Sequence, residues 1–152
     1  MRNLIVATAL FAAAIPATGA IAQSDGVTTY PVQAEYGDVT FGVETAIVGR
    51  GYVVDNISHV GEMLNRTAAD VGAAVQIYSQ ADVYQFCSAV LSRKMMEMDP
   101  NNIAHCPYGV FVFELADSPG TVQVGYRHMP EGAMQEVQQL LDAIAKEAAG
   151  IE

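Results

Sequence analysis

Two apolar segments near the C-terminus, separated by a turn, limit most strongly how this chain can fold. Residues 108–115 and 121–127 have the apolar character of β-strands, and the five residues between them read Ala-Asp-Ser-Pro-Gly. Aspartate, serine, proline and glycine are the residue types that turns favour. Two strands joined by a short turn pair as an antiparallel hairpin. The fold is therefore expected to contain an antiparallel sheet.

Three segments have the spacing of amphipathic helices. Residues 39–49 follow Asp38, a candidate N-cap, and stop at Gly49 or Gly51. Residues 88–98 begin at Ser88 and end before Asp99-Pro100. The last segment, 131–149, places its apolar residues on one face: Met134, Val137, Leu140, Leu141, Ile144 and Ala148.

Strand character is also found upstream of the hairpin, in residues 27–36, 52–57 and 83–86. Residues 59–64 either extend the second of these strands or turn away, while 65–72 form a loop or one helical turn, and 101–107 form a loop. The expected order is β-α-β-β-α-β-β-α. Antiparallel strands with helices gathered on one face define an α+β two-layer sandwich.

The N-terminal segment, residues 1–22, is predicted to be a secretory signal peptide. It carries one positive residue, Arg2, then an apolar run over 4–15, and ends in Ala20-Ile21-Ala22, so cleavage is expected before Gln23. This leaves residues 23–152 as one domain. We expect the protein to be exported to the periplasm.

A transmembrane helix is the alternative for the same segment. Pro16 and Gly19 interrupt it before it reaches the roughly 20 apolar residues that a membrane span requires. No later stretch of the sequence is apolar enough for long enough to span a bilayer. A mature chain without a membrane span is therefore expected.

Composition and charge exclude several classes of protein. With 51% hydrophobic and 16% charged residues, the chain is too apolar for intrinsic disorder. The net charge is −10 for the full sequence, and it becomes −11 for residues 23–152, which hold six basic and seventeen acidic residues. This sign disfavours nucleic acid and anionic membranes as partners.

Cys87 and Cys106 are the only cysteines of the chain. In an exported protein an even cysteine count favours a disulfide, which here would close a loop of about twenty residues and stabilise the fold by roughly 3 kcal/mol. The alternative is a redox pair. Cys87 lies where a strand becomes a helix, a position that lowers a thiol pKa, and protonated His105 could do the same for Cys106.

The contexts of both cysteines resemble those in the family named domain of unknown function 302. The matching segments are Phe-Cys-Ser-Ala at 86–89, Met-Asp-Pro at 98–100, and His-Cys-Pro-Tyr-Gly-Val-Phe-Val-Phe-Glu at 105–114. The likeness continues through 122–130 and more loosely through 39–61, so it covers most of residues 23–152. The resemblance implies a compact α+β fold, often dimeric, and it brings no agreed activity. His105 stands where many members have proline, which resembles a periplasmic branch.

A soft-metal or haem site is a second hypothesis. Thioether, thiolate and imidazole groups suit Cu(I), and histidine with methionine can hold haem iron. The lack of a fixed metal-site spacing favours core packing for the methionines instead. The candidate ligands are Cys87, Met95, Met96, Met98, His105, Cys106, His128 and Met129.

No G-x-S-x-G, H-E-x-x-H, P-loop or G-x-G-x-x-G motif occurs in the sequence, which disfavours an enzyme of those classes. Residues that could contact a small ligand are His105, Tyr108, Arg127 and His128. The favoured function is a small exported binding or accessory domain, as a homodimer, with Cys87 and Cys106 as a disulfide or as ligand-facing thiols. The alternatives are a copper or haem carrier and a thiol redox protein linked to sulfur compounds.

Overall fold

The computed structural model describes residues 22–24 and 26–151. Six strands and four α-helices are present in these residues, with one 3-10 helix, η1. In chain order they are β1 (Ala22–Ser24), β2 (Val27–Val32), α1 (Tyr36–Gly49), β3 (Val54–Ser58), α2 (Val60–Thr67), β4 (Tyr78–Phe86), α3 (Ala89–Met98), η1 (Pro100–His105), β5 (Tyr108–Leu115), β6 (Val122–Arg127) and α4 (Gln135–Ala148).

All six strands belong to one antiparallel sheet in the order β1-β2-β6-β5-β4-β3. The predicted hairpin is present as β5 and β6, with Val112 opposite Val124. On its other side β5 pairs with β4 along its length, from Phe86 opposite Tyr108 to Tyr78 opposite Leu115. β3 is shorter than β4 and its pairing ends at Ser58 opposite Val83.

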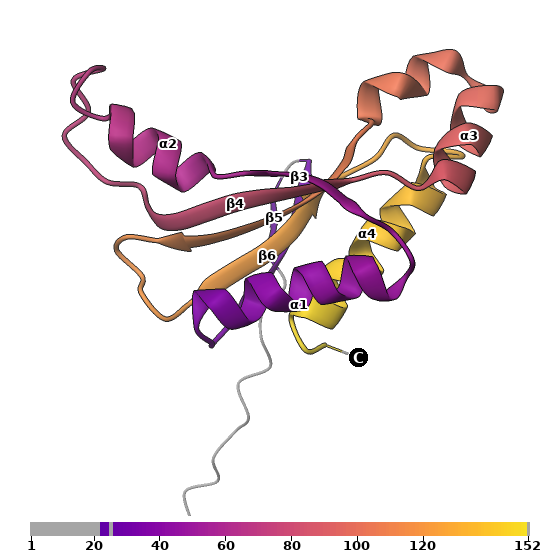
Figure 1. The fold of residues 1–152 in the computed structure, drawn as a ribbon. Coiled ribbons are helices and arrows are strands. Elements are labelled where there is room, and N and C mark those ends of the chain that lie inside the picture. Colours follow the sequence, from indigo (N-terminus) through magenta and orange to yellow (C-terminus); the bar gives the residue numbers. More distant parts are fainter. Residues whose placement is uncertain (1–21, 25, 152) are drawn as a thin grey trace, which may run out of the picture.

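Helices α1 and α4 lie side by side against one face of the sheet (Figure 1). The core forms between these helices and the strands, because alternate residues of β5 and β6 point toward them. Its fully buried side chains include Val43, Ile47, Val110, Val112, Val124, Leu141 and Ile144. The α+β two-layer fold predicted from the sequence is confirmed.

The region between β3 and β4 differs from the prediction. Residues 60–67 form the helix α2, and β4 begins at Tyr78 rather than at residue 83. Gly61 allows α2 to pack closely on β4, since a Cβ at this position would lie 2.5 Å from the backbone nitrogen of Ala81. The first half of β4 is polar, and it lies at the edge of the sheet beside this helix, since β3 pairs only with the second half.

Smaller differences concern the ends of helices. α1 begins at Tyr36 with Glu35 as its N-cap, so Asp38 lies in the first turn and the predicted N-cap was wrong. The predicted loop 101–107 is mostly the 3-10 helix η1, and α4 begins four residues later than predicted. Ser88, where the helix was predicted to begin, is the N-cap of α3, and its hydroxyl accepts a hydrogen bond from the backbone N–H of Leu91.

The predicted signal peptide falls almost entirely on residues 1–21, which lie outside the described residues. β1 begins at Ala22, so cleavage before Gln23 would leave the last two residues of this strand on the mature chain. Within residues 22–24 and 26–151, no helix is long and apolar enough to cross a membrane.

Candidate functional site

The two cysteines meet because β4 and β5 are neighbours in the sheet. Cys87 directly follows Phe86, the last residue of β4, and precedes the N-cap of α3. Cys106 follows η1 and is joined by a cis peptide bond to Pro107, just before β5 begins. Phe86 pairs with Tyr108 in the sheet, so the chain leaves β4 and returns to β5 at adjacent points.

The Sγ atoms of Cys87 and Cys106 are 3.8 Å apart, and both cysteines are free thiols. A disulfide has an S–S distance of about 2.05 Å, so the predicted disulfide is not formed in this structure. The Cys87 thiol donates a hydrogen bond toward Cys106 instead. Cys87 is exposed and Cys106 is half-buried, so Cys87 is the more accessible of the two cysteines.

Hydrogen bonds continue from the thiols to the core. The Cys106 thiol donates to Ser92 Oγ at 3.4 Å, and the Ser92 hydroxyl donates to the Tyr108 hydroxyl at 3.2 Å. Tyr108 is almost fully buried, and burial is the main cause of the raised pKa of its hydroxyl. The predicted ligand residue Tyr108 therefore does not face solvent. It is linked to the thiol pair through the Ser92 hydroxyl.

The electrostatic surroundings raise the pKa of Cys87 to about 11. The main cause is partial burial of the sulfur, followed by the hydrogen bond to Cys106 and the charges of Cys106 and Asp55. The backbone N–H of Tyr108 acts in the opposite direction but is outweighed. The expectation that the helix N-terminus would lower this pKa was wrong, because partial burial and the hydrogen bond to Cys106 raise it.

The other predicted ligand residues do not converge on the cysteines. His128 Nε2 lies 2.9 Å from Thr28 Oγ1, so this imidazole is bonded to β2. Arg127 is exposed at the end of β6, next in sequence to that histidine. His105 is half-buried in the last turn of η1, directly before Cys106. Of these residues, His105 is a chain neighbour of the thiol pair.

The predicted soft-metal ligands are dispersed. Met95 and Met129 are buried in the core, as expected for methionines that fill apolar gaps, whereas Met98 is exposed and Met96 half-buried on α3. In residues 22–24 and 26–151 there is no group of three or more histidine, cysteine or acidic side chains that could hold a metal ion. The structure thus brings together the two thiols but not the wider ligand set.

A second polar cluster, which the sequence did not suggest as a site, lies where β3 meets α2. His59 Nδ1 is 2.7 Å from Asp82 Oδ1, and the Tyr36 hydroxyl donates to Asp82 Oδ2 at 3.0 Å. His59 is not among the ligand residues predicted from the sequence. No linear spacing links residues 36, 59 and 82, which come from three different elements.

The fold and the thiol pair together define a small α+β domain with two neighbouring cysteines at the ends of β4 and β5. The family model described as "Domain of unknown function DUF302" matches residues 28–150, so the chain belongs to this family, as the resemblance predicted. A similar fold occurs in the crystal structure of the uncharacterized conserved protein DUF302 from Bacillus stearothermophilus. That protein has 14% sequence identity and a TM-score of 0.58, and the match covers 84% of this chain and 95% of that one. No curated protein matches the chain.

Proposed function

We propose that this protein is an exported accessory domain that exchanges disulfides through Cys87 and Cys106. The observation that carries the proposal is the 3.8 Å distance between two free sulfurs, one of which is exposed. Formation of a disulfide requires the two sulfurs to approach from 3.8 Å to about 2.05 Å. Ser92 and Tyr108 hold the inner thiol in place.

The reaction partner in this proposal is a disulfide, either of a small molecule or of another protein. The thiolate of exposed Cys87 attacks one sulfur of that disulfide, which forms a mixed disulfide and releases one thiolate. The thiolate of Cys106 then attacks Cys87 Sγ and releases the second. Two protein thiols are oxidised and the partner disulfide is reduced to two thiolates, which take up, through solvent, the two protons that the protein thiols have lost and so become thiols.

We expect oxidised glutathione to convert the protein to an intramolecular disulfide, with a mass lower by two hydrogen atoms. The rate should rise about tenfold per pH unit from neutral pH toward pH 11, because the thiolate is the nucleophile and the pKa of Cys87 is raised to about 11. Mass spectrometry of samples quenched with acid measures both the product and the rate.

Single-cysteine variants provide the control for this reaction. Cys106→Ser should stop at a stable mixed disulfide with glutathione on Cys87, whereas Cys87→Ser should react more slowly because the remaining sulfur is half-buried. Two thiols that stay free and unmodified in the unaltered protein at pH 10 would contradict the proposal.

N-terminal analysis of the same protein from a periplasmic extract tests export, with Gln23 as the expected first residue.

We also propose that the protein is a homodimer formed through the face of the sheet opposite α1 and α4. Phe111 and Phe113 are stacked there with ring centroids 6.1 Å apart, and with Val83 they line an apolar cavity of about 320 Å³. Light scattering after gel filtration should give twice the monomer mass. Phe113→Ser should give monomers, whereas Phe41→Ser, on exposed α1, should remain dimeric. A monomeric unaltered protein would contradict this part of the proposal.

A further inference from the structure

A groove lies between α2 and the first half of β4. It exists because β3 stops pairing at Ser58 while β4 extends further along the sheet edge, and α2 turns away from the same point. Its volume is about 570 Å³, within the range of small-molecule sites. The groove is separate from the thiol pair and is lined mainly by polar residues, among them His59, Glu62, Arg66 and Asp82.

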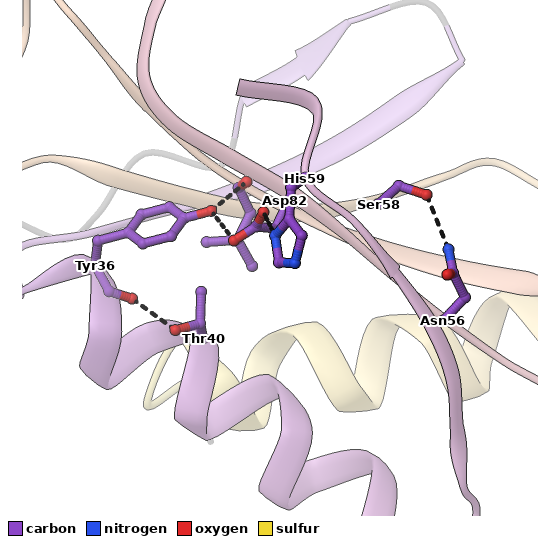
Figure 2. Close-up of polar contacts among 7 residues, drawn as sticks. Tyr36, Thr40, Asn56, Ser58, His59 and Asp82 are labelled. Atoms are coloured by element: carbon purple, nitrogen blue, oxygen red, sulfur yellow. Dashed lines mark hydrogen bonds and ion pairs between the residues drawn. The ribbon is translucent and has the colours of Figure 1, made fainter. Parts of the chain in front are cut away.

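The imidazole of His59 is held in this groove by a chain of hydrogen bonds that begins in the core. Tyr36 is buried, and its hydroxyl lies 3.0 Å from Asp82 Oδ2 and 3.2 Å from the carbonyl oxygen of Val112. The other carboxylate oxygen of Asp82 lies 2.7 Å from His59 Nδ1. Figure 2 shows the tyrosine and the imidazole on opposite sides of the Asp82 carboxylate.

This arrangement orients the imidazole. A carboxylate accepts hydrogen bonds, so it favours the tautomer with the proton on Nδ1 and leaves Nε2 as an acceptor. Figure 2 shows the second ring nitrogen of His59 on the side away from Asp82. The Asp82 side chain is 17% exposed, whereas that of His59 is 59% exposed. An inner carboxylate therefore positions an outer imidazole that a ligand can reach.

Arg66 supplies a positive charge in the same groove. Within residues 22–24 and 26–151, four of the basic side chains form ion pairs with carboxylates: Arg50, Arg93, Lys94 and Lys146. Arg66 and Arg127 form none among the described residues. In a chain with seventeen acidic residues, an arginine without a carboxylate partner is available for an anionic ligand.

We propose that this groove binds a small organic acid that also carries a hydroxyl group. Arg66 binds the carboxylate, and the hydroxyl donates a hydrogen bond to His59 Nε2. His59 is the N-cap of α2 and Arg66 follows it seven positions later, about 10 Å along a helix axis, so the two groups lie at opposite ends of the ligand. The negative charges of Glu62 and Asp82 face the same groove and disfavour a second carboxylate.

NMR titration with 4-hydroxybutyrate tests the proposal. We expect saturable shifts of the Arg66 and His59 signals, weaker binding of butyrate, which lacks the hydroxyl, and none of butane-1,4-diol, which lacks the carboxylate. Arg66→Gln should weaken binding about tenfold or more, as expected for the loss of a charge-assisted hydrogen bond. Arg127→Gln removes the other unpaired arginine and should leave the affinity unchanged.

The nitrogen shifts of the His59 ring test the positioning by Asp82. We expect the Nδ1–H tautomer in the unaltered protein and a mixture of tautomers in Asp82→Asn, together with a smaller preference for 4-hydroxybutyrate over butyrate. The absence of saturable shifts, or equal losses in the two arginine variants, would overturn the proposal. So would an Nε2–H tautomer in the unaltered protein. Neither result bears on disulfide exchange, which is measured on other residues.

Discussion

Gly125→Ala is expected to lower the free energy of unfolding by about 3 kcal/mol, because a side chain at this position overpacks the sheet. Gly125 lies in β6, opposite Thr29 of β2 and Phe111 of β5. A Cβ there would overlap the backbone oxygen of Thr28, and it would lie 2.9 Å from two ring atoms of Phe111. The ring can rotate away, but the backbone oxygen belongs to a paired strand and cannot.

Urea denaturation followed by circular dichroism measures this effect. Gly109→Ala is the matched control, because Gly109 lies in the adjacent strand β5 and a Cβ there meets only ordinary contacts, the nearest at 3.5 Å. We expect this control to change the stability by less than about 1 kcal/mol. Equal losses in the two variants would show that the close approach of β2 to β6 does not account for the effect of Gly125→Ala.

Asp142→Ala is the second substitution with a large expected effect, again about 3 kcal/mol. Asp142, on α4, accepts hydrogen bonds from the hydroxyls of Tyr30 and Tyr126 and forms an ion pair with Lys146 at 2.7 Å. Both tyrosines are buried, so their hydroxyls would lose the acceptor that satisfies them. The variant therefore leaves unsatisfied polar groups between α4 and the sheet.

The contribution of Asp142 should also depend on pH. Burial opposes its ionisation, but the hydrogen bonds from Lys146, Tyr30 and Tyr126 outweigh burial and lower the pKa of the carboxyl group. A carboxyl group with a lowered pKa stabilises the fold above its ordinary value of 3.8, and this stability is lost as the pH falls through the lowered value. Denaturation at pH 7 and below pH 3 should therefore show a smaller difference between the unaltered protein and Asp142→Ala at the acidic pH.

Glu136→Ala is the control for Asp142→Ala, since Glu136 lies on the same helix and pairs with Lys94 at the surface. Exposed ion pairs contribute little, and we expect a change below about 1 kcal/mol. If Asp142→Ala is no more destabilising than this control, the proposed role of the tyrosine hydroxyls is wrong.

The parts of the fold that follow from local pattern were predictable. The β5–β6 hairpin, α3 with its Ser88 cap and most of α4 all carry periodic apolar residues or turn signals. Helix α2 has apolar residues at helical spacing, Val60, Met63 and Leu64, but it has only eight residues, no side-chain cap and a glycine that packs on β4, so its local sequence does not distinguish it from a strand or a turn. Its place is set by the edge of the sheet, which is a tertiary feature and leaves little trace in local sequence.

The candidate sites divide in the same way. The two cysteines were identifiable as residue types, and the adjacency of β4 and β5 explains why they meet. The raised pKa of Cys87 depends first on its partial burial and then on Cys106 and Asp55, all of which are known only from the fold. The same holds for Tyr36, His59 and Asp82, which are far apart in the sequence and have no motif in common.

The two cysteines also flank the segment that connects β4 to β5 outside the sheet. Residues 88–105, which contain α3 and η1, leave after β4 and return before β5, and in Figure 1 they lie at the opposite end of the sheet from α2. Oxidation of the pair would close this segment into a covalent loop. The lower chain entropy of its open states would make them less favourable by about 3 kcal/mol. The oxidation state of two sulfurs would then control how often these helices detach and expose Met95, the residue that α3 buries in the core.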